Sequence, residues 1–164
     1  MEVEASIEVR QAPFDPGAEL SAFDARGAGA VVSFTGVVRG DGNLALMEIE
    51  HWPGATEEAL AAIVAEARAR WDLTAVRVLH RWGPMRPGEP IMMVLAAAPH
   101  RRAAFEAAEF LMDVLKSRAP FWKKEHRAAG SSWVEAREED EGALGRWAAQ
   151  GQGEQDGGEQ GRDA

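Results

Sequence analysis

Hydrophobic and polar residues along the first third of the chain alternate in a way that predicts strands, a short helix and a hairpin. The predicted elements are an edge strand at residues 5–10, a turn and short helix at residues 13–23, a buried strand at residues 30–38 and a returning strand at residues 44–52. The Asp-Gly-Asn sequence at residues 41–43 signals the hairpin turn. On the returning strand, Met47 and Ile49 occupy the face opposite Glu48. Arg39 is therefore expected at the mouth of a loop.

Helical periodicity marks two longer stretches. The first helix is expected to have Thr56 as its N-cap, and the second to begin at about His100 and end before Pro120. Their apolar stripes are Leu60, Ile63, Val64, Ala67 and Trp71 in the first helix, and Ala104, Ala108, Leu111 and Leu115 in the second. Further strands are predicted at residues 75–83, 89–98 and 131–138.

The order of these elements favours an α+β fold with a largely antiparallel sheet. Hairpins join several strands, whereas a doubly wound parallel sheet would alternate strands and helices throughout. We expect residues 1–147 to form a single domain with a small β lobe. Residues 148–164 are mostly Gly, Gln and acidic residues, which predicts a disordered acidic tail.

Composition excludes several kinds of chemistry. The 164 residues include no cysteine, which rules out disulfides, thiolate metal sites, persulfide carriers and cysteine nucleophiles. The four histidines lack metal-site spacing and nucleotide-binding glycine motifs are missing, so we expect no metal and no cofactor. Neither a signal peptide nor an apolar run long enough to span a bilayer is present, so we expect a cytoplasmic protein without membrane contact.

Positive charge is concentrated in one segment of an acidic chain. The formal net charge is −9, but residues 100–127 carry seven Lys or Arg against four Asp or Glu. The flanking segments, residues 1–99 and 128–164, each have a net charge of −6. A basic segment of this length indicates an anionic ligand of limited size, because nucleic-acid-binding domains are usually basic throughout.

Two groups of basic residues in this segment are candidates for chemistry. His100 and Arg101 stand where a strand ends and a helix begins, so backbone N–H groups and the helix dipole favour an anion there; solvated surface charge is the simpler alternative. Lys116 ends the helix, and Lys123 and Lys124 follow it. Cations crowded beside aromatic rings suit proton transfer or nucleophilic attack. Stabilisation of the helix dipole explains Lys116 equally well, but not the two later lysines.

Distance separates the two groups within one chain. His100 and Lys116 are sixteen residues apart, about 24 Å along a continuous helix, so one small ligand cannot touch both. Either the two sites are independent, or His100 and Arg101 of one subunit meet Lys116 and Lys123 of another across a two-fold axis. We favour the composite dimer site, because a two-fold interface brings opposite ends of equivalent elements together.

Several segments resemble the large, catalytic subunit of molybdopterin synthase. In order along the chain they are GAVVSFTGVVR, EHWPGATEEAL, HRWG followed by PGE, PHRRAAFEAAEFLMDVLKSRAPFWKKE and WVEARE. The resemblance covers residues 28–147 and is most specific in LKSRAPFWKKE. It implies an α+β fold with an α/β-hammerhead portion, and a central dimer of large subunits with a small subunit at each end.

The resemblance also implies a sulfurtransferase in molybdenum cofactor biosynthesis. Members of the family convert cyclic pyranopterin monophosphate to molybdopterin. Sulfur arrives as a thiocarboxylate on the C-terminal glycine of a small ubiquitin-like carrier that ends in Gly-Gly. Lys116 and Lys123 match the family's active-site lysines and are expected to be catalytic. The expected substrate-binding residues are Val37, Val38, Arg39, His100, Arg101, Lys116, Lys123, Lys124, Glu125 and Arg137.

Two other functions compete with this one. The chain could be a non-catalytic docking module for the tail of a ubiquitin-like protein, with the basic segment as an electrostatic receptor. It could also bind nucleotides or RNA by stacking bases on Phe121 and Trp122. The net charge of −9 argues against the second alternative.

Overall fold

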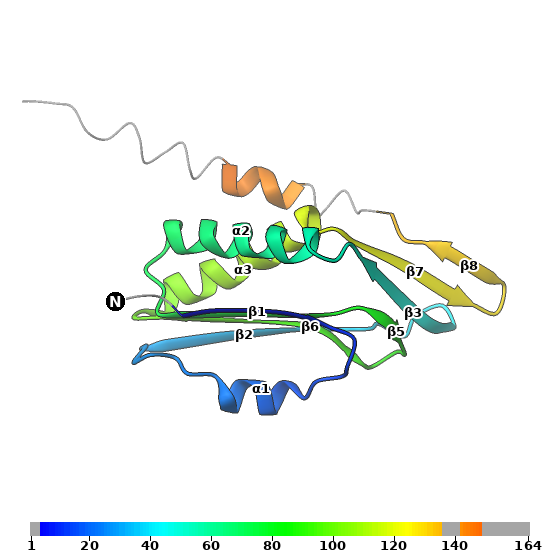
Figure 1. Cartoon of the computed structure of the whole chain (residues 1–164), viewed down its shortest axis with the longest axis horizontal. Helices are drawn as coiled ribbons and strands as arrows, with labels where there is room; N and C mark the ends of the chain where they lie inside the picture. Colours follow the sequence, from blue (N-terminus) through cyan, green and yellow to red (C-terminus); the bar gives the residue numbers. More distant parts are fainter. Residues whose placement is uncertain (1–3, 136–141, 149–164) are drawn as a thin grey trace, which may run out of the picture.

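Two four-stranded sheets form the frame of the fold in the computed structural model, which describes residues 4–135 and 142–148 (Figure 1). The first sheet has the order β1-β4-β6-β2, with bounds Glu4–Arg10, Ala75–Arg81, Pro90–Ala98 and Ala30–Val37. The second has the order β5-β3-β7-β8, with bounds Gly83–Met85, Leu44–His51, Phe121–Arg127 and Gly130–Trp133. The β1–β4 pair is parallel and the other pairs are antiparallel. The predicted α+β class with a largely antiparallel sheet is confirmed.

Helices lie on both faces of the first sheet. α2 (Ala55–Arg70) and α3 (Arg101–Arg118) cover one face, and α1 (Pro16–Ala22) lies on the other (Figure 1). A further helix, residues 142–148, packs Trp147 edge-on against Trp71 and Phe110. The Trp147 indole N–H also donates a hydrogen bond to Oδ2 of Asp113 at 2.7 Å. This helix therefore covers apolar surface where α2 and α3 meet. Of the predicted tail at residues 148–164, all but residue 148 lies outside the described residues.

The main core lies between the first sheet and helices α2 and α3. It buries Leu60 and Ile63 from α2, Phe110 and Leu111 from α3, and Val94 from β6. Each side chain of this size contributes roughly 1.5–3 kcal/mol when it leaves water. The predicted helical stripes are therefore the buried stripes, although Trp71 is only partly buried.

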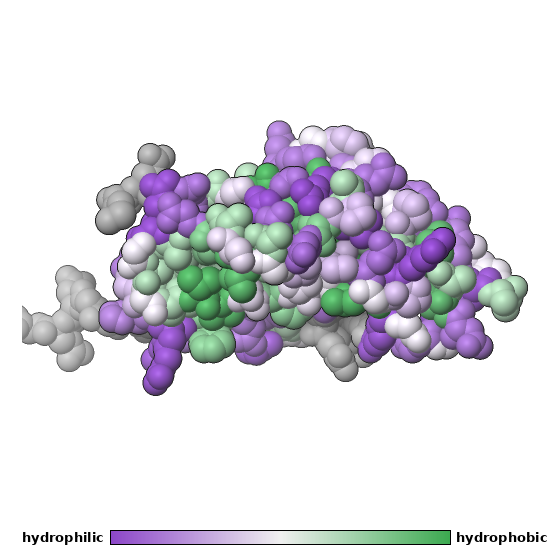
Figure 2. Space-filling view, turned by 90° about the horizontal axis from the view of Figure 1, so that it is seen from below, coloured by the Kyte–Doolittle hydropathy of each residue, from purple (hydrophilic) through white to green (hydrophobic). Residues whose placement is uncertain are grey.

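A smaller core lies under α1. It consists of Phe14, Leu79, Met93 and Leu95, with Phe23 packed against it. Val31 on β2 is 41% exposed and alternates with Ala30 and Val32, which pack on the main core, so its side chain points to the α1 side. Seen from this side, the surface shows an apolar patch among polar residues (Figure 2). A seven-residue helix covers this face of the sheet only in part.

The expectation of a buried strand at residues 30–38 is wrong for most of its length. β2 is the last strand of its sheet and pairs with β6 alone among the described strands. Val37 is 49% exposed, whereas Val38, just beyond the strand, is buried in the core. A β-branched run between glycines fits a buried strand and an exposed edge strand equally well, so the sequence pattern could not separate them.

The predicted hairpin between β2 and β3 is also wrong. The Asp-Gly-Asn turn exists, but β2 belongs to the first sheet and β3 pairs with β5 and β7 in the second. No strand was predicted between Pro120 and residue 131, but residues 121–127 form strand β7, and residues 83–85 form a separate strand, β5. Met47 and Ile49 are nevertheless buried together, as the alternation predicts.

Thr56 does not cap α2. The N-cap is Gly54, with φ of +85°, and its N–H donates to the carboxylate of Glu57 at 2.7 Å. Thr56 is fully buried one residue inside the helix, and its hydroxyl donates to the Trp52 carbonyl at 2.9 Å. Glycine accommodates the positive φ at this cap without a Cβ penalty, which a threonine there would incur.

Candidate active site

The first basic group lies at the N-terminus of α3. His100 is the N-cap residue, with extended backbone and no side-chain hydrogen bond to the helix, and Arg101 begins the helix. Both side chains are exposed. Arg102 forms an ion pair with Glu106 at 2.8 Å, whereas Arg101 has no polar partner among the described residues. Of the two arginines, Arg101 is therefore the one available to an anion at the positive end of the helix dipole.

The second basic group lies where α3 passes into β7. Lys116 is in the last turn of α3, and β7 begins at Phe121, only five residues later. Because α3 is continuous over 18 residues, Lys116 and His100 stand at opposite ends of it, as the sequence predicts. In Figure 1 the N-terminal end of α3 lies to the left, and its C-terminal end points toward β7 on the right.

Lys116 lines one end of an apolar groove between α3 and the edge strand β2. The groove has a volume of about 460 Å³, and its walls include Phe34 from β2 and Phe105 and Met112 from α3. Phe34 is 41% exposed and Phe105 is 62% exposed. Large aromatic side chains left in water along an edge strand are typical of a surface that another protein covers.

Lys123 and Lys124 point to opposite faces of β7, since successive strand side chains alternate. Lys124 places its ammonium group 5.2 Å from the ring centroid of Trp133 on β8, on the outer face of the second sheet. Lys123 lies on the face of Phe121 and Glu125 and close enough to His80 for its charge to lower the pKa of that imidazole. The two lysines, treated together in the sequence analysis, therefore face different environments.

His80 and Phe121 form a stacked pair beside Lys123. Their ring centroids are 3.6 Å apart with an interplanar angle of 14°, and His80 is buried. Nδ1 of His80 donates to the Arg81 carbonyl at 2.7 Å, so the neutral ring has its lone pair on Nε2. Burial is the largest cause that lowers the pKa of His80, to about 3. The hydrogen bond to Arg81 acts in the opposite direction, and the charges of Lys123 and His51 lower the pKa further. His80 is a neutral neighbour of the lysine, and the sequence did not reveal this contact because β7 was not predicted.

Arg39 opens the loop after β2. Its side chain is exposed and approaches Oδ2 of Asp41, with Nε 3.4 Å away. The Val38 side chain packs in the core, and its backbone N–H and carbonyl are bonded to Glu89 and Gly88. Val38 therefore anchors the loop, and only Val37 and Arg39 of the three predicted residues expose their side chains.

Of the remaining predicted contacts, Glu125 lies within the described residues and Arg137 does not. Glu125 lies on the Lys123 face of β7 and forms an ion pair with Arg127 at 2.8 Å. Arg137 lies outside the described residues, as does most of the C-terminal half of the predicted late strand. The period-two pattern Phe-x-Lys-x-Glu-x-Arg at residues 121–127 is the signal that would have revealed β7 and the shared face.

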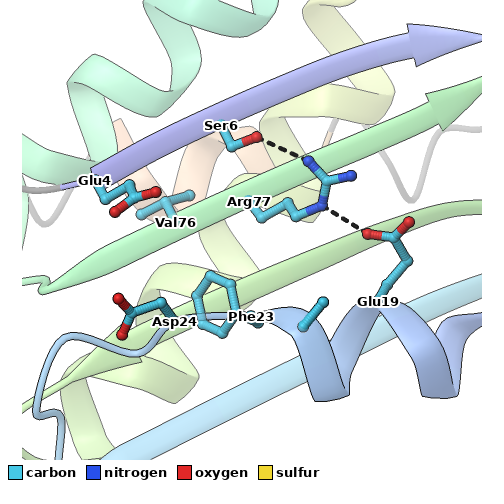
Figure 3. Close-up of a pocket in the computed structure, with 8 residues that line it drawn as sticks. Glu4, Ser6, Glu19, Phe23, Asp24, Val76 and Arg77 are labelled. Carbon is cyan, nitrogen blue, oxygen red and sulfur yellow. Dashed lines mark hydrogen bonds and ion pairs between the residues drawn. The ribbon is translucent and has the colours of Figure 1, made fainter.

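A second concave site lies on the α1 side of the first sheet (Figure 3). Its volume is about 260 Å³, and one of its lining side chains, Arg77, bonds to Ser6, Glu8 and Glu19 at 2.8–2.9 Å. The hydrogen bond from Arg77 lowers the pKa of Glu8. Since all three guanidinium nitrogens are engaged, Arg77 supports the attachment of α1 rather than the binding of an anion.

In the part of the chain that the structure describes, no group of three His, Asp or Glu side chains is placed to hold a metal ion. Nor is any of its helices both long and apolar enough to cross a bilayer.

The chain is similar in sequence to proteins of one family. The family model for the MoaE protein matches residues 9–118. A molybdopterin synthase catalytic subunit from Cereibacter sphaeroides is 61% identical over 142 residues, which cover 85% of this chain and 97% of that protein.

Solved structures agree with this similarity. The molybdopterin biosynthesis MoaE protein from Burkholderia ambifaria matches with a TM-score of 0.76 at 46% identity, over 88% of this chain and 98% of that one. A protein–protein complex of subunits 1 and 2 of the molybdopterin-converting factor from Helicobacter pylori matches with a TM-score of 0.70 over 80% of this chain and 91% of that one. At 19% identity, the second likeness shows the fold alone.

Proposed function

Since the chain belongs to the MoaE family of molybdopterin synthase catalytic subunits, which act in molybdenum cofactor biosynthesis, we propose that it transfers sulfur to cyclic pyranopterin monophosphate. The donor is the C-terminal thiocarboxylate of a small ubiquitin-like carrier ending in Gly-Gly, and the product is the dithiolene of molybdopterin. The lack of cysteine supports sulfur brought by a partner.

The observation that carries the proposal is the placement of Lys116 and Lys123 on either side of the passage from α3 to β7. An anionic thiocarboxylate and a phosphate-bearing pterin repel each other, so fixed cations are needed where they meet. Two carriers each supply one sulfur. Thiocarboxylate attack forms a carbon–sulfur bond on the pterin side chain while a carbon–oxygen bond breaks, which opens the cyclic phosphate in one addition and releases water in the other. Water then cleaves each acyl–sulfur bond, leaving sulfur on the pterin and a carboxylate on the carrier. Lys116 and Lys123 are proposed to move the protons that these steps require.

A composite site across a dimer would bring the phosphate-binding pair to these lysines. Arg101, Phe105, Met112 and Lys116 occupy one stripe of α3, cationic at its ends and apolar between them. If two copies pack this stripe antiparallel about a two-fold axis, Arg101 of each copy lies opposite Lys116 of the other. The exposed Phe34 and Phe105 along the groove support a second copy as its occupant, because their burial would stabilise the dimer.

The test is product formation from defined components. The chain is mixed with thiocarboxylated carrier and cyclic pyranopterin monophosphate, and the dithiolene product is measured. A Lys116→Ala variant that binds the carrier normally but makes no product would support catalysis. Carrier binding without product from the wild-type chain would leave only the docking function.

A further inference from the structure

Arg127, the last residue of β7, contacts the loop that carries Arg39. Its Nη1 donates to the backbone carbonyl of Asp41 at 2.8 Å and also to that of Gly42. Its Nη2 donates to Oε2 of Glu125 at 2.8 Å. The guanidinium group is thus held by a carboxylate of its own strand and reaches across to two loop carbonyls.

The loop contacted by Arg127 ends in a tight turn. Gly42 and Asn43 both have φ of +58°, and the N–H of Leu44 donates to the Asp41 carbonyl at 3.2 Å, as in a type I′ turn. A Cβ atom on Gly42 would lie 2.7 Å from Nη1 of Arg127. The glycine therefore serves the turn and also leaves room for the arginine.

Arg39 depends on these contacts for its place. Its guanidinium is exposed, and its described ion pair, with Asp41, is made within the same loop. The loop is attached to the rest of the molecule at Val38, through the β5–β6 turn, and at its other end by the pairing of Leu44 with Arg127 in the β3–β7 ladder. Between these two ends, the Arg127 side chain holds the carbonyls of Asp41 and Gly42. Arg127 is thus the side chain that joins the Arg39 loop to the strand of Lys123.

We infer that Arg127 is a positioning residue: it holds the loop of residues 39–43 against β7, so that Arg39 and Lys123 keep a fixed spacing around the anionic pterin. The inference rests on the proposed function. Glu125, which is predicted to contact substrate, also orients the Arg127 guanidinium through their ion pair. Two charge-assisted hydrogen bonds to carbonyls fix both the position and the direction of the turn.

The experiment compares Arg127→Ala in two backgrounds. In the wild-type background, we expect the KM for cyclic pyranopterin monophosphate to rise about tenfold with little change in kcat, as for lost substrate binding. In an Arg39→Ala background, the same substitution should raise KM by less than about twofold, because the residue it positions is gone. Equal effects in both backgrounds, or an unchanged KM, would overturn the inference.

Arg70 provides a matched control. Its side chain is 27% exposed against 29% for Arg127, and it also bonds one carboxylate, Glu66, and one backbone carbonyl, that of Trp147. Arg70 lies on α2 and is not one of the predicted substrate contacts, although its partner Glu66 also pairs with Arg118 at the end of α3. Arg70→Ala should lower the melting temperature about as much as Arg127→Ala and leave KM unchanged. A rise in KM equal to that of Arg127→Ala would mean that lost stability alone raises KM.

Gly42→Ala tests the same contact if Arg127→Ala does not fold. The added methyl group would meet the guanidinium and is also strained at the positive φ of this position, so the turn loses its contact with Arg127 although the arginine remains, and KM should rise as in Arg127→Ala. An unchanged KM would count against the inference. No product from the wild-type chain would refute the proposed function, whereas an active wild type with an Arg39 effect but no Arg127 effect refutes the inference alone.

Discussion

The imidazole of His80 lies on the ring of Phe121, with ring centroids 3.6 Å apart and a 14° angle between the planes. This contact joins the two sheets, since His80 belongs to β4 and Phe121 to β7. It also places a neutral aromatic group, rather than another cation, beside Lys123. Because His80 is buried in this contact, its protonation is coupled to the stability of the fold.

Stability should fall on mild acidification because of His80. The pKa of His80 is about 3 in the folded chain against 6.5 as its ordinary value, so only the unfolded chain takes up this proton between those limits. The free energy of unfolding therefore has its full value, as far as His80 is concerned, above pH 6.5. It decreases as the pH falls from 6.5 toward 3. From pH 7 to pH 5 the loss from this group is about 2 kcal/mol.

Urea unfolding of wild type and His80→Phe at the two pH values checks this. The phenylalanine keeps the aromatic stack but cannot titrate, so its free energy of unfolding should fall by about 2 kcal/mol less between pH 7 and pH 5. Loss of the hydrogen bond to the Arg81 carbonyl lowers its stability at both pH values equally. The same pH-dependent loss in both proteins would show that His80 does not resist protonation.

Subunit exchange should rescue two inactive variants if the site is composite. Arg101→Ala and Lys116→Ala each damage one half of both sites in a dimer. A mixed dimer holds one site with both substitutions and one site with neither. We expect up to about a quarter of wild-type activity from an equimolar mixture after exchange, since half of the dimers are mixed and each has one intact site. Activity that stays at the level of the separate variants would indicate a site within one chain.

A charge in the groove should separate the dimer. Phe105→Asp places a carboxylate in the apolar stretch of α3, where two copies would bury it twice, whereas in a monomer the 62% exposed position tolerates the change. Light scattering after size exclusion should therefore report the mass of a monomer. The product assay should show much reduced activity. Leu20→Asp on α1, also an exposed helical apolar residue, is the control and should remain dimeric. A dimeric Phe105→Asp protein would exclude this surface as the interface.

The two adjacent lysines of β7 should differ in their effect on activity. Lys123 shares a strand face with Phe121 and Glu125, and Lys124 packs over Trp133 on the other side of the sheet. We expect Lys123→Ala to lower kcat about 100-fold or more, in the range of lost acid–base catalysis. Lys124→Ala should change it by less than about threefold, because the exposed cation–π contact is weak. If Lys123→Ala and Lys124→Ala lowered the single-turnover rate by comparable factors, the two faces of β7 would not have different roles in catalysis.

Local patterns in the sequence were sufficient for much of the fold. The stripes of α2 and α3, the antiparallel β4–β6 pair and the end of α3 before Pro120 follow from periodicity and from proline geometry, which act within a few residues. Motif resemblance likewise supplied Lys116, Lys123, Arg39, His100 and Arg101 as candidates. Each of these predictions depends on neighbours along the chain.

The division into two sheets could not be predicted in the same way. The turn at residues 41–43 looks the same whether the strands that flank it pair with each other or, as here, with β6 and with β7. Strand pairing is decided by which distant residues are buried together, and β7 finds its partner β3 some seventy residues earlier in the chain. The missed strand is the reason that the faces of Lys123 and Lys124 were not separated.

The sequence by itself determined the composition and the local elements. The chain has no cysteine, one basic segment and two long helices with apolar stripes. Tertiary structure alone decided which of those residues share a face or a groove. It stacked His80 on Phe121 and joined Arg127 to the loop of Arg39. Both contacts join residues more than forty positions apart. Packing between the two sheets sets the geometry of the first, and pairing of β7 with β3 in the second sheet sets that of the second; no local pattern records either.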